Sequence, residues 1–151
     1  MRIDRWLDAS PERVYATLID PSAVGRWRVP EGMTAEVHEF EPRVGGSVRV
    51  SLTYEDASGI GKTSARTDTY TGRFLELVPH RRVVEVDEFE TDDPALRGAM
   101  TMTFELTPER GGTRLVGTHE GVPAAVSEED NEAGWRSSLD RLAALVEQTP
   151  V

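Results

Sequence analysis

The sequence predicts an α+β fold in which a curved antiparallel sheet of seven strands surrounds one long C-terminal helix, with two short helices after the first strand. Two observations carry the prediction. The last stretch, Ser127 to Gln148, repeats its apolar residues with the period of a helix. Most of the chain between residues 33 and 120 instead alternates apolar and polar residues between Gly and Pro turns, which is typical of strands. The economical arrangement is one sheet bent around one helix.

The C-terminal helix is the firmest element. Trp135, Leu139, Leu142 and Val146 stand at i, i+4, i+7 and i+11, which is a single stripe of a helix with 3.6 residues per turn. Ser127 is placed to cap the first turn, and the acidic residues after it stand where the helix dipole favours anions. Calcium binding by these carboxylates is not favoured, because the segment lacks the spacing and the Gly of an EF-hand loop.

Residues 3–27 are predicted to form one strand and two short helices. Residues 3–8 alternate and predict a first strand. Ser10 followed by Pro11 predicts the start of a helix with a buried stripe that ends at Ile19. The sequence Asp20-Pro21-Ser22 then ends that helix and caps a second short one, Ala23 to Trp27.

Six further strands follow, separated by turn residues such as Gly45-Gly46, Pro79-His80 and Gly111-Gly112. We predict them over residues 33–40, 47–54, 66–77, 82–89, 100–106 and 113–120. The segment 56–63 is predicted to be a polar loop.

Composition excludes several classes of protein. The 151 residues suffice for one domain with a core, and the chain contains no cysteine. A formal net charge of −10 argues against a nucleic-acid partner, because such binding depends on Lys and Arg. The sequence has no apolar run long enough for a membrane span and no signal peptide, so we expect a soluble, cytoplasmic protein. Phosphate loops, nucleophile elbows and zinc-protease motifs are absent.

Several short stretches, in this order, resemble a known family. They are Ala9-Ser10-Pro11-Glu12-Arg13-Val14-Tyr15, Trp27-Arg28-Val29-Pro30, Pro42-Arg43-Val44-Gly45-Gly46-Ser47-Val48, Gly112-Thr113-Arg114-Leu115, Thr118-His119-Glu120-Gly121, and Gly134-Trp135 with Leu139 and Leu142 after it. Together they resemble the activator of heat-shock protein 90 ATPase homologue family of the START-like (SRPBCC, Bet v 1-like) superfamily. The resemblance covers essentially the whole chain. It implies a helix-grip fold and a single START-like domain over residues 1–151.

The chain departs from the family pattern at three places. Glu41 stands where the family usually has Asp, Trp27-Arg28 where it often has two Trp, and Gly117 where it has a large apolar residue.

A sheet bent around a helix is expected to leave a cavity on its concave side. We predict that ten residues bind a ligand there: Trp27, Tyr54, Arg66, Tyr70, Phe89, Met102, Phe104, Gly117, Trp135 and Leu139. If Leu115 faces the helix, Gly117 and His119 do also, because strand side chains alternate. Gly117 then either leaves extra room beside Trp135 or lets the helix approach closely, and the sequence supports both interpretations equally.

His119 is the candidate for proton transfer, because its ordinary pKa suits a general base and its ring could donate to a ligand carbonyl. A core histidine bonded to backbone is the more common arrangement, and we take it as the first interpretation. His38 and His80 are weaker candidates, on an outer strand and in a turn.

Charged residues share one face of two strands that we expect to be neighbours. The set is Arg66, Asp68 and Tyr70 on one strand and Val83, Glu85, Asp87 and Phe89 on the other. We interpret this face as solvated, because most such sets are. If it lines the cavity instead, Arg66 could bind a ligand carboxylate or phenolate and Asp87 could act as acid or base.

The resemblance and the expected cavity favour binding of a small apolar or amphipathic ligand, which could be lipid-, aromatic- or polyketide-like. A second hypothesis is an enzyme of the cyclase or dehydratase type that uses His119 and an inward carboxylate such as Asp87. A third, implied by the family name, is a module that contacts a chaperone. No cofactor or metal is expected, and the edge strand at residues 33–40 could pair in a homodimer.

Overall fold

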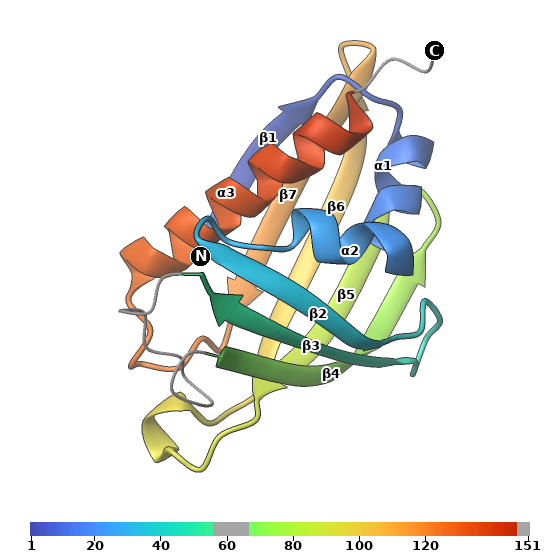
Figure 1. Ribbon diagram of the computed structural model, residues 1–151. Coiled ribbons are helices and arrows are strands. Elements are labelled where there is room, and N and C mark those ends of the chain that lie inside the picture. Colours follow the sequence, from blue (N-terminus) through green and yellow to red (C-terminus); the bar gives the residue numbers. More distant parts are fainter. Residues whose placement is uncertain (56–66, 148–151) are drawn as a thin grey trace.

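The computed structural model describes residues 1–55 and 67–147, and it shows one curled antiparallel sheet with helices packed on its concave side (Figure 1). The seven strands stand in the order β1-β7-β6-β5-β4-β3-β2. All neighbours are antiparallel, and every pair except β1 with β7 is consecutive in sequence. The predicted fold class is therefore confirmed.

The elements follow the predicted order, and their bounds are β1 (Arg2–Leu7), α1 (Pro11–Leu18), α2 (Pro21–Trp27), β2 (Met33–Phe40), β3 (Ser47–Tyr54), β4 (Thr67–Val78), β5 (Arg82–Phe89), η1 (Pro94–Leu96), β6 (Met100–Glu109), β7 (Gly112–Glu120) and α3 (Glu128–Val146). The short 3₁₀ turn η1 lies between β5 and β6. Three predicted features lie outside the described residues: the loop over residues 56–63, the side chain of Arg66 and the helix end at Gln148.

Each helix begins at a capping side chain that the sequence contains. Ser10, Asp20 and Ser127 occupy the N-cap positions of α1, α2 and α3, and each accepts a hydrogen bond from a backbone N–H in the first turn. Pro stands among the first residues of α1 and α2, where its missing N–H costs nothing. The two short helices are thus set by local sequence.

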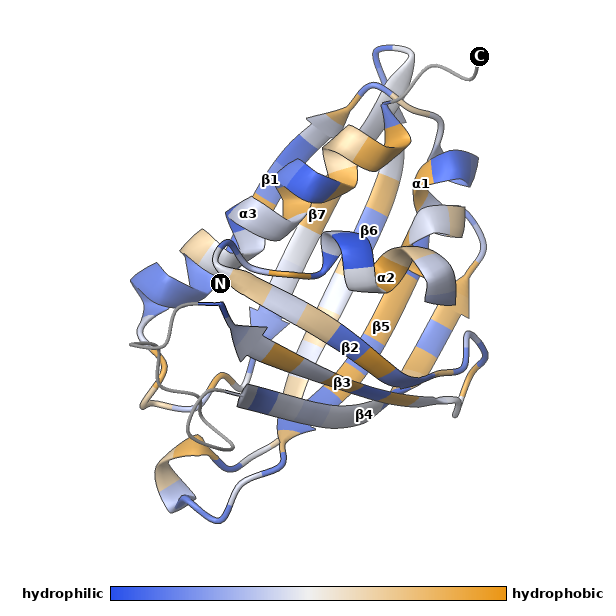
Figure 2. Ribbon diagram, viewed as in Figure 1, coloured by the Kyte–Doolittle hydropathy of each residue, from blue (hydrophilic) through white to orange (hydrophobic). Residues whose placement is uncertain are grey.

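Helix α3 lies along the sheet with the predicted stripe inward. Trp135, Leu139, Leu142 and Val146 are all buried, together with Ala143. Along the strands, hydrophobic and hydrophilic residues alternate (Figure 2), as expected for a sheet with one face on the core. The core therefore lies between the concave face of the sheet and the three helices.

The curvature of the sheet is helped by two irregularities. The pairing of β2 with β3 shifts register between Val37 and Glu39, and that of β4 with β5 shifts between Phe74 and Glu76. An extra residue of this kind bends its strand and increases the local twist. The sheet can therefore wrap one end of α3 while β1 packs along the helix.

No helix within residues 1–55 and 67–147 is long and apolar enough to cross a membrane.

Candidate functional site

A cavity of about 650 Å³ lies between the first half of α3 and the concave face of the sheet. Side chains from α2, from strands β2 to β7 and from the segment before α3 contribute to its wall. The apolar and aromatic part of the wall includes Trp27, Met33, Leu52, Phe89, Met100, Met102, Phe104, Trp135 and Leu139. Its size falls within the range of about 300–1,000 Å³ that is usual for small-molecule sites.

The structure brings most of the predicted site residues together. Eight of the ten line the cavity: Trp27, Tyr54, Tyr70, Phe89, Met102, Phe104, Trp135 and Leu139. His119 also lines it. Gly117 does not, and Arg66 lies outside the described residues. The predicted lining depended on strand register, and the observed register places alternate residues of β3, β4 and β6 on this wall.

No empty space lies beside Gly117, so the interpretation that this glycine leaves extra room for a ligand was wrong. A Cβ atom built on this residue would overlap Cζ3 of Trp135 and lie 3.1 Å from its Cε3. The indole of Trp135 therefore occupies the space that Gly117 leaves, and it is fixed there by Phe104, whose ring centroid lies 5.3 Å away. Because Gly117 has no side chain, Trp135 can pack against it and α3 can approach β7 closely.

A buried ion pair stands beside the cavity. Arg28 donates from Nη1 and Nη2 to the two carboxylate oxygens of Glu85, at 2.8 and 3.1 Å. The Glu85 side chain is 0% exposed and that of Arg28 11%. The guanidinium also packs against Trp27 and Phe104, with its Cζ atom 5.4 and 6.0 Å from the ring centroids. Arg28 was not among the predicted site residues, although it stands at one of the departures from the family pattern.

The charged set on β4 and β5 faces the core, so the solvated-face interpretation was wrong. Asp68, Tyr70, Glu85 and Asp87 are all buried, with Glu85 completely enclosed. The cause lies in the pairing of Glu85 with Arg28, which compensates a charge that the interior would otherwise exclude. Asp87 is buried next to this pair but is not part of the cavity wall.

Asp87 and Glu85 share a proton-dependent contact. If both groups were carboxylates they would only accept hydrogen bonds, and neither oxygen of Asp87 would have a partner among the described residues; a proton on Asp87 allows it to donate to Glu85. Burial, followed by the charge of Glu85, raises the pKa of Asp87 well above its ordinary value. Burial alone would raise the pKa of Glu85, but Arg28 and a hydrogen bond from protonated Asp87 outweigh burial and lower it. Asp87 is therefore the protonated partner.

Replacing Asp87 with Asn should raise the stability of the protein at neutral pH. Between about pH 4 and the raised pKa of Asp87, the folded state holds a proton that the unfolded state has lost, so the free energy of unfolding falls as pH rises. Asn donates to Glu85 without a proton to lose. Urea unfolding from pH 4 to pH 8 should give a slope of unfolding free energy against pH that is more positive for Asp87→Asn than for the wild type. Equal slopes would show that Asp87 is ionised in the folded state.

His119 lies at the cavity wall with its Nδ1 atom already engaged. The indole N–H of Trp135 donates to Nδ1 at 3.1 Å, so Nδ1 is an acceptor. Oδ1 of Asn131 is placed 3.2 Å from the same atom, and because this oxygen cannot donate to an acceptor, we infer that the amide is turned to present its NH₂ group and that the ring proton resides on Nε2. Both groups that contact His119 Nδ1 are side chains, whereas the first interpretation from sequence was a histidine whose ring bonds to backbone.

His119 should titrate far below the ordinary range for histidine. Burial lowers its pKa from 6.5 to about 4. The unfolded state binds more protons than the folded state between these values, so the stabilising contribution is complete above about pH 6.5 and is lost as pH falls towards 4. Ring-proton chemical shifts followed by NMR will measure this pKa, with His119→Gln used to assign the resonance. A midpoint near 6.5 would contradict the buried neutral ring.

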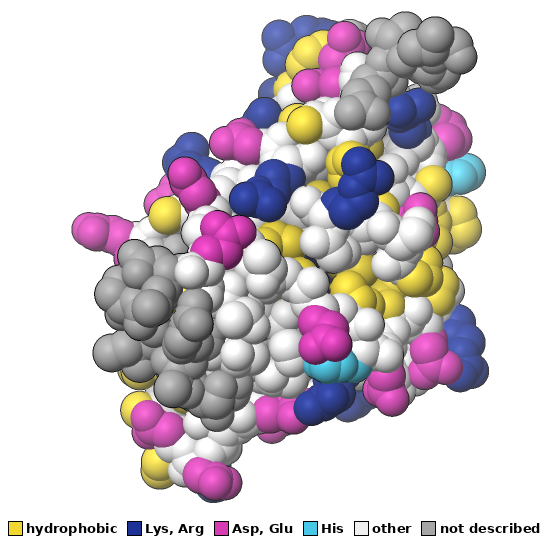
Figure 3. Space-filling view, in the orientation of Figure 1, with side chains coloured by type: hydrophobic (Ala, Val, Ile, Leu, Met, Phe, Trp, Pro, Cys, Tyr) yellow, Lys and Arg dark blue, Asp and Glu magenta, His cyan; other side chains and the backbone are white. Residues whose placement is uncertain are grey.

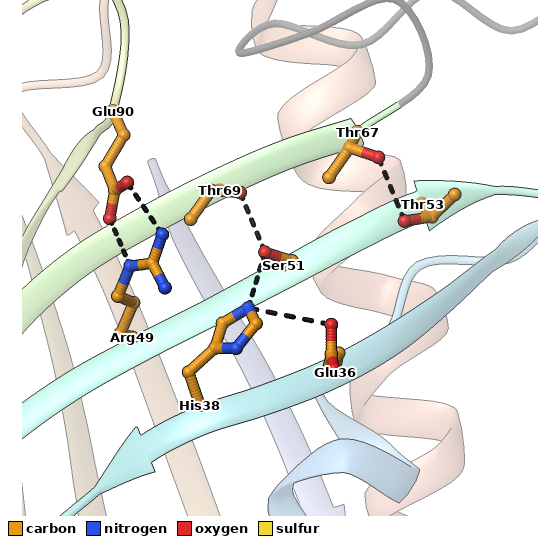
Figure 4. A network of polar contacts seen from close by, with 8 residues as sticks. All are labelled: Glu36, His38, Arg49, Ser51, Thr53, Thr67, Thr69 and Glu90. Carbon is orange, nitrogen blue, oxygen red and sulfur yellow. Dashed lines mark hydrogen bonds and ion pairs between the residues drawn. The ribbon is translucent and has the colours of Figure 1, made fainter.

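The convex face of the sheet carries a separate polar network (Figure 4). Ser51 Oγ lies 2.8 Å from both His38 Nε2 and Thr69 Oγ1, and Arg49 donates to Glu90 at 2.7 and 3.0 Å. Glu36 lies 3.8 Å from the same Nε2 atom. A Ser-His-acid relay needs the acid on the other ring nitrogen, so this network does not have that geometry. It satisfies polar groups on the outer face.

The surface shown in Figure 3 carries acidic and basic side chains interspersed, with hydrophobic side chains in small groups. Large hydrophobic residues that are exposed within the described ranges are Val44, Leu75 and Val78. Over these same ranges, no three His, Asp or Glu residues gather as a metal site would require.

Comparison with known proteins agrees with this architecture. Residues 8–147 match the family described as activator of Hsp90 ATPase homolog 1-like protein. A crystal structure of a Chromobacterium violaceum protein is similar at 40% identity and a TM-score of 0.88, covering 99% of this chain and 97% of that chain. A Silicibacter pomeroyi protein shares the fold at 21% identity and a TM-score of 0.79, with 97% and 96% coverage. No curated protein sequence matches.

Proposed function

Because the chain belongs to the family of activator of Hsp90 ATPase homolog 1-like proteins, we propose that it binds a small apolar or amphipathic molecule in the cavity between α3 and the sheet. The observation that supports this proposal is the cavity of about 650 Å³ with its apolar and aromatic wall. A curled sheet that closes on a helix is a scaffold for such binding. Lipid-like, aromatic and polyketide-like molecules all fit this description.

The enzyme hypothesis has less support. Asp87 does not line the cavity, so it cannot reach a bound substrate directly. His119 does line it, but a pKa of about 4 makes its ring a weak base at neutral pH. The chaperone hypothesis would need a contiguous exposed apolar patch of several hundred Å². A homodimer through β2 and a cytoplasmic location stay predictions.

Native mass spectrometry of freshly purified protein tests the proposal, with a denatured aliquot alongside. Extra mass that is present in the native spectrum and lost on denaturation would identify a ligand held without a covalent bond. The substitution Leu52→Trp should reduce that occupancy, because Leu52 lines the cavity and the larger ring would fill part of it. Leu75→Trp is the matched control, since Leu75 is 43% exposed on β4 and is not part of the wall.

Two results would count against the proposal. Equal occupancy in both tryptophan variants would place the ligand elsewhere on the molecule. If the native protein carries no extra mass and binds no apolar probe in solution, the cavity is not a binding site.

A further inference from the structure

One end of the cavity wall is polar. Arg28 and Tyr70 line it there, and Trp27 adjoins them. The hydroxyl of Tyr70 and the indole N–H of Trp27 are buried without a hydrogen-bond partner among residues 1–55 and 67–147. Tyr70 is 8% exposed and Trp27 1%. Buried polar groups without partners cost free energy, so an end of the cavity with two of them is prepared for a polar group that the protein does not supply.

Arg28 adds donors to the same end. A guanidinium has five N–H groups, and Glu85 accepts from Nη1 and Nη2 only. The side chain keeps 11% of its surface exposed, and it lines the cavity. The donors that remain can therefore reach a group inside the cavity while Glu85 holds the guanidinium in place.

The charges around the cavity argue against an anionic ligand. The positive charge of Arg28 is already compensated by Glu85 at hydrogen-bond distance. The acidic residues of the wall are Glu31, Asp68 and Asp130, and no Lys lines it in the described part of the chain. A carboxylate entering this site would give up its hydration without gaining an unpaired cation. A neutral group meets no such penalty.

We propose that the cavity selects ligands with a neutral oxygen, a carbonyl or a hydroxyl, that docks on Arg28 and Tyr70 while the apolar body lies along α3. This inference rests on the proposed function. The ring of Tyr70 forms part of the wall, and its hydroxyl, which has no partner among the described residues, is the group that we assign to the ligand oxygen. Simple hydrocarbons and fatty acids are then poor ligands, the first for lack of the oxygen and the second because of their charge.

Four naphthalene probes of nearly equal size test the selection: 2-naphthol, 2-methylnaphthalene, 2-naphthoate and 2-naphthylmethylammonium. Isothermal titration calorimetry with the full-length protein at pH 7 should give the tightest binding for 2-naphthol, about tenfold tighter than for 2-methylnaphthalene. The two charged probes should bind more weakly than 2-naphthol.

Tyr70→Phe separates a ligand-binding hydroxyl from a structural one. The variant should bind 2-naphthol and 2-methylnaphthalene with more nearly equal affinity. Without ligand it should melt about 2–4 °C higher than the wild type, because an unpaired buried hydroxyl is removed. Tyr15→Phe is the matched control: Tyr15 is equally buried at 8% exposure, lies in the core and does not line the cavity. It should leave the selectivity between probes unchanged.

The possible outcomes distinguish this inference from the proposed function. If no probe binds the wild type, the proposed function fails and the inference fails with it. If 2-methylnaphthalene binds as tightly as 2-naphthol, or if either charged probe binds tightest, the cavity binds ligands but the inference is wrong. A Tyr70→Phe protein that melts lower and keeps the wild-type selectivity would assign the hydroxyl a structural role and overturn the inference also.

Discussion

Glu85→Ala should lower the free energy of unfolding by about 3–5 kcal/mol, because it leaves the guanidinium of Arg28 buried without a counter-ion. Glu85 is 0% exposed and accepts both hydrogen bonds that Arg28 makes through Nη1 and Nη2. The loss should lie towards the lower end of this range, since Asp87 stands beside the pair and can give up its proton to replace part of the missing charge. Urea unfolding at pH 7 measures the change.

The matched control is Glu105→Ala on the neighbouring strand. Glu105 pairs with Arg82 at 3.3 Å, but its side chain is 52% exposed, so solvent screens the pair and its removal should cost less than about 1 kcal/mol. Combining Glu85→Ala with Asp87→Asn should cost more than Glu85→Ala alone, because neither Glu85 nor Asp87 can then supply a negative charge to Arg28. A Glu85→Ala protein as stable as the Glu105→Ala control would show that Arg28 is not confined in the interior.

Gly117→Ala should destabilise the protein by about 2–3 kcal/mol through overpacking. The added Cβ atom would overlap the indole of Trp135, and the indole cannot move freely. It donates to His119 at 3.1 Å and packs on Phe104 at a centroid distance of 5.3 Å. Relief of the overlap must therefore push the ring towards the cavity, so binding of apolar probes should weaken together with stability.

Gly134→Ala makes the same chemical change on α3 with the opposite expected sign. A Cβ atom there would meet only Cγ of Pro30, at 3.9 Å, which is ordinary van der Waals contact. Ala is favoured over Gly inside a helix by about 1 kcal/mol, so this variant should be more stable than the wild type. If both substitutions changed stability in the same direction, the close contact between Gly117 and Trp135 would not be the cause.

The long helix could be predicted because its signal is local. The stripe of Trp135, Leu139, Leu142 and Val146 depends only on the helical period, and Ser127 marks the start within the same segment. Strand positions followed equally well from turn residues such as Gly45-Gly46. Neither kind of signal requires knowledge of which distant residues meet.

The buried face of β5 could not be assigned in this way. Valines stand on both faces of the strand, Val83 on the inner face and Val84 and Val86 on the outer, so alternation does not decide which side is buried. The deciding contact is the ion pair of Glu85 with Arg28, whose residues are 57 positions apart. A pairing of that kind depends on the tertiary fold and leaves no periodic trace in the sequence.

Gly117 illustrates a different limit. A residue without a side chain is compatible with an empty space or with a neighbour that fills it, and only the position of Trp135 decides between the two. The sequence placed Gly117 and His119 on the inner face correctly because that step needs only the strand period. Which atoms occupy the volume beside them depends on the approach of α3.

The pairing of β1 with β7 has a consequence for how the chain acquires its structure. Arg2 pairs with Thr118 and Leu7 with Thr113, whereas every other pair of neighbouring strands is consecutive along the chain. Consecutive strands can form as hairpins with little loss of loop entropy, but β1 must wait for a partner more than a hundred residues later. During synthesis the hairpins from β2 to β6 can therefore assemble while β1 stays unpaired. The last step to a closed core is the arrival of β7 and α3 together, and folding should be slow for a protein of this size.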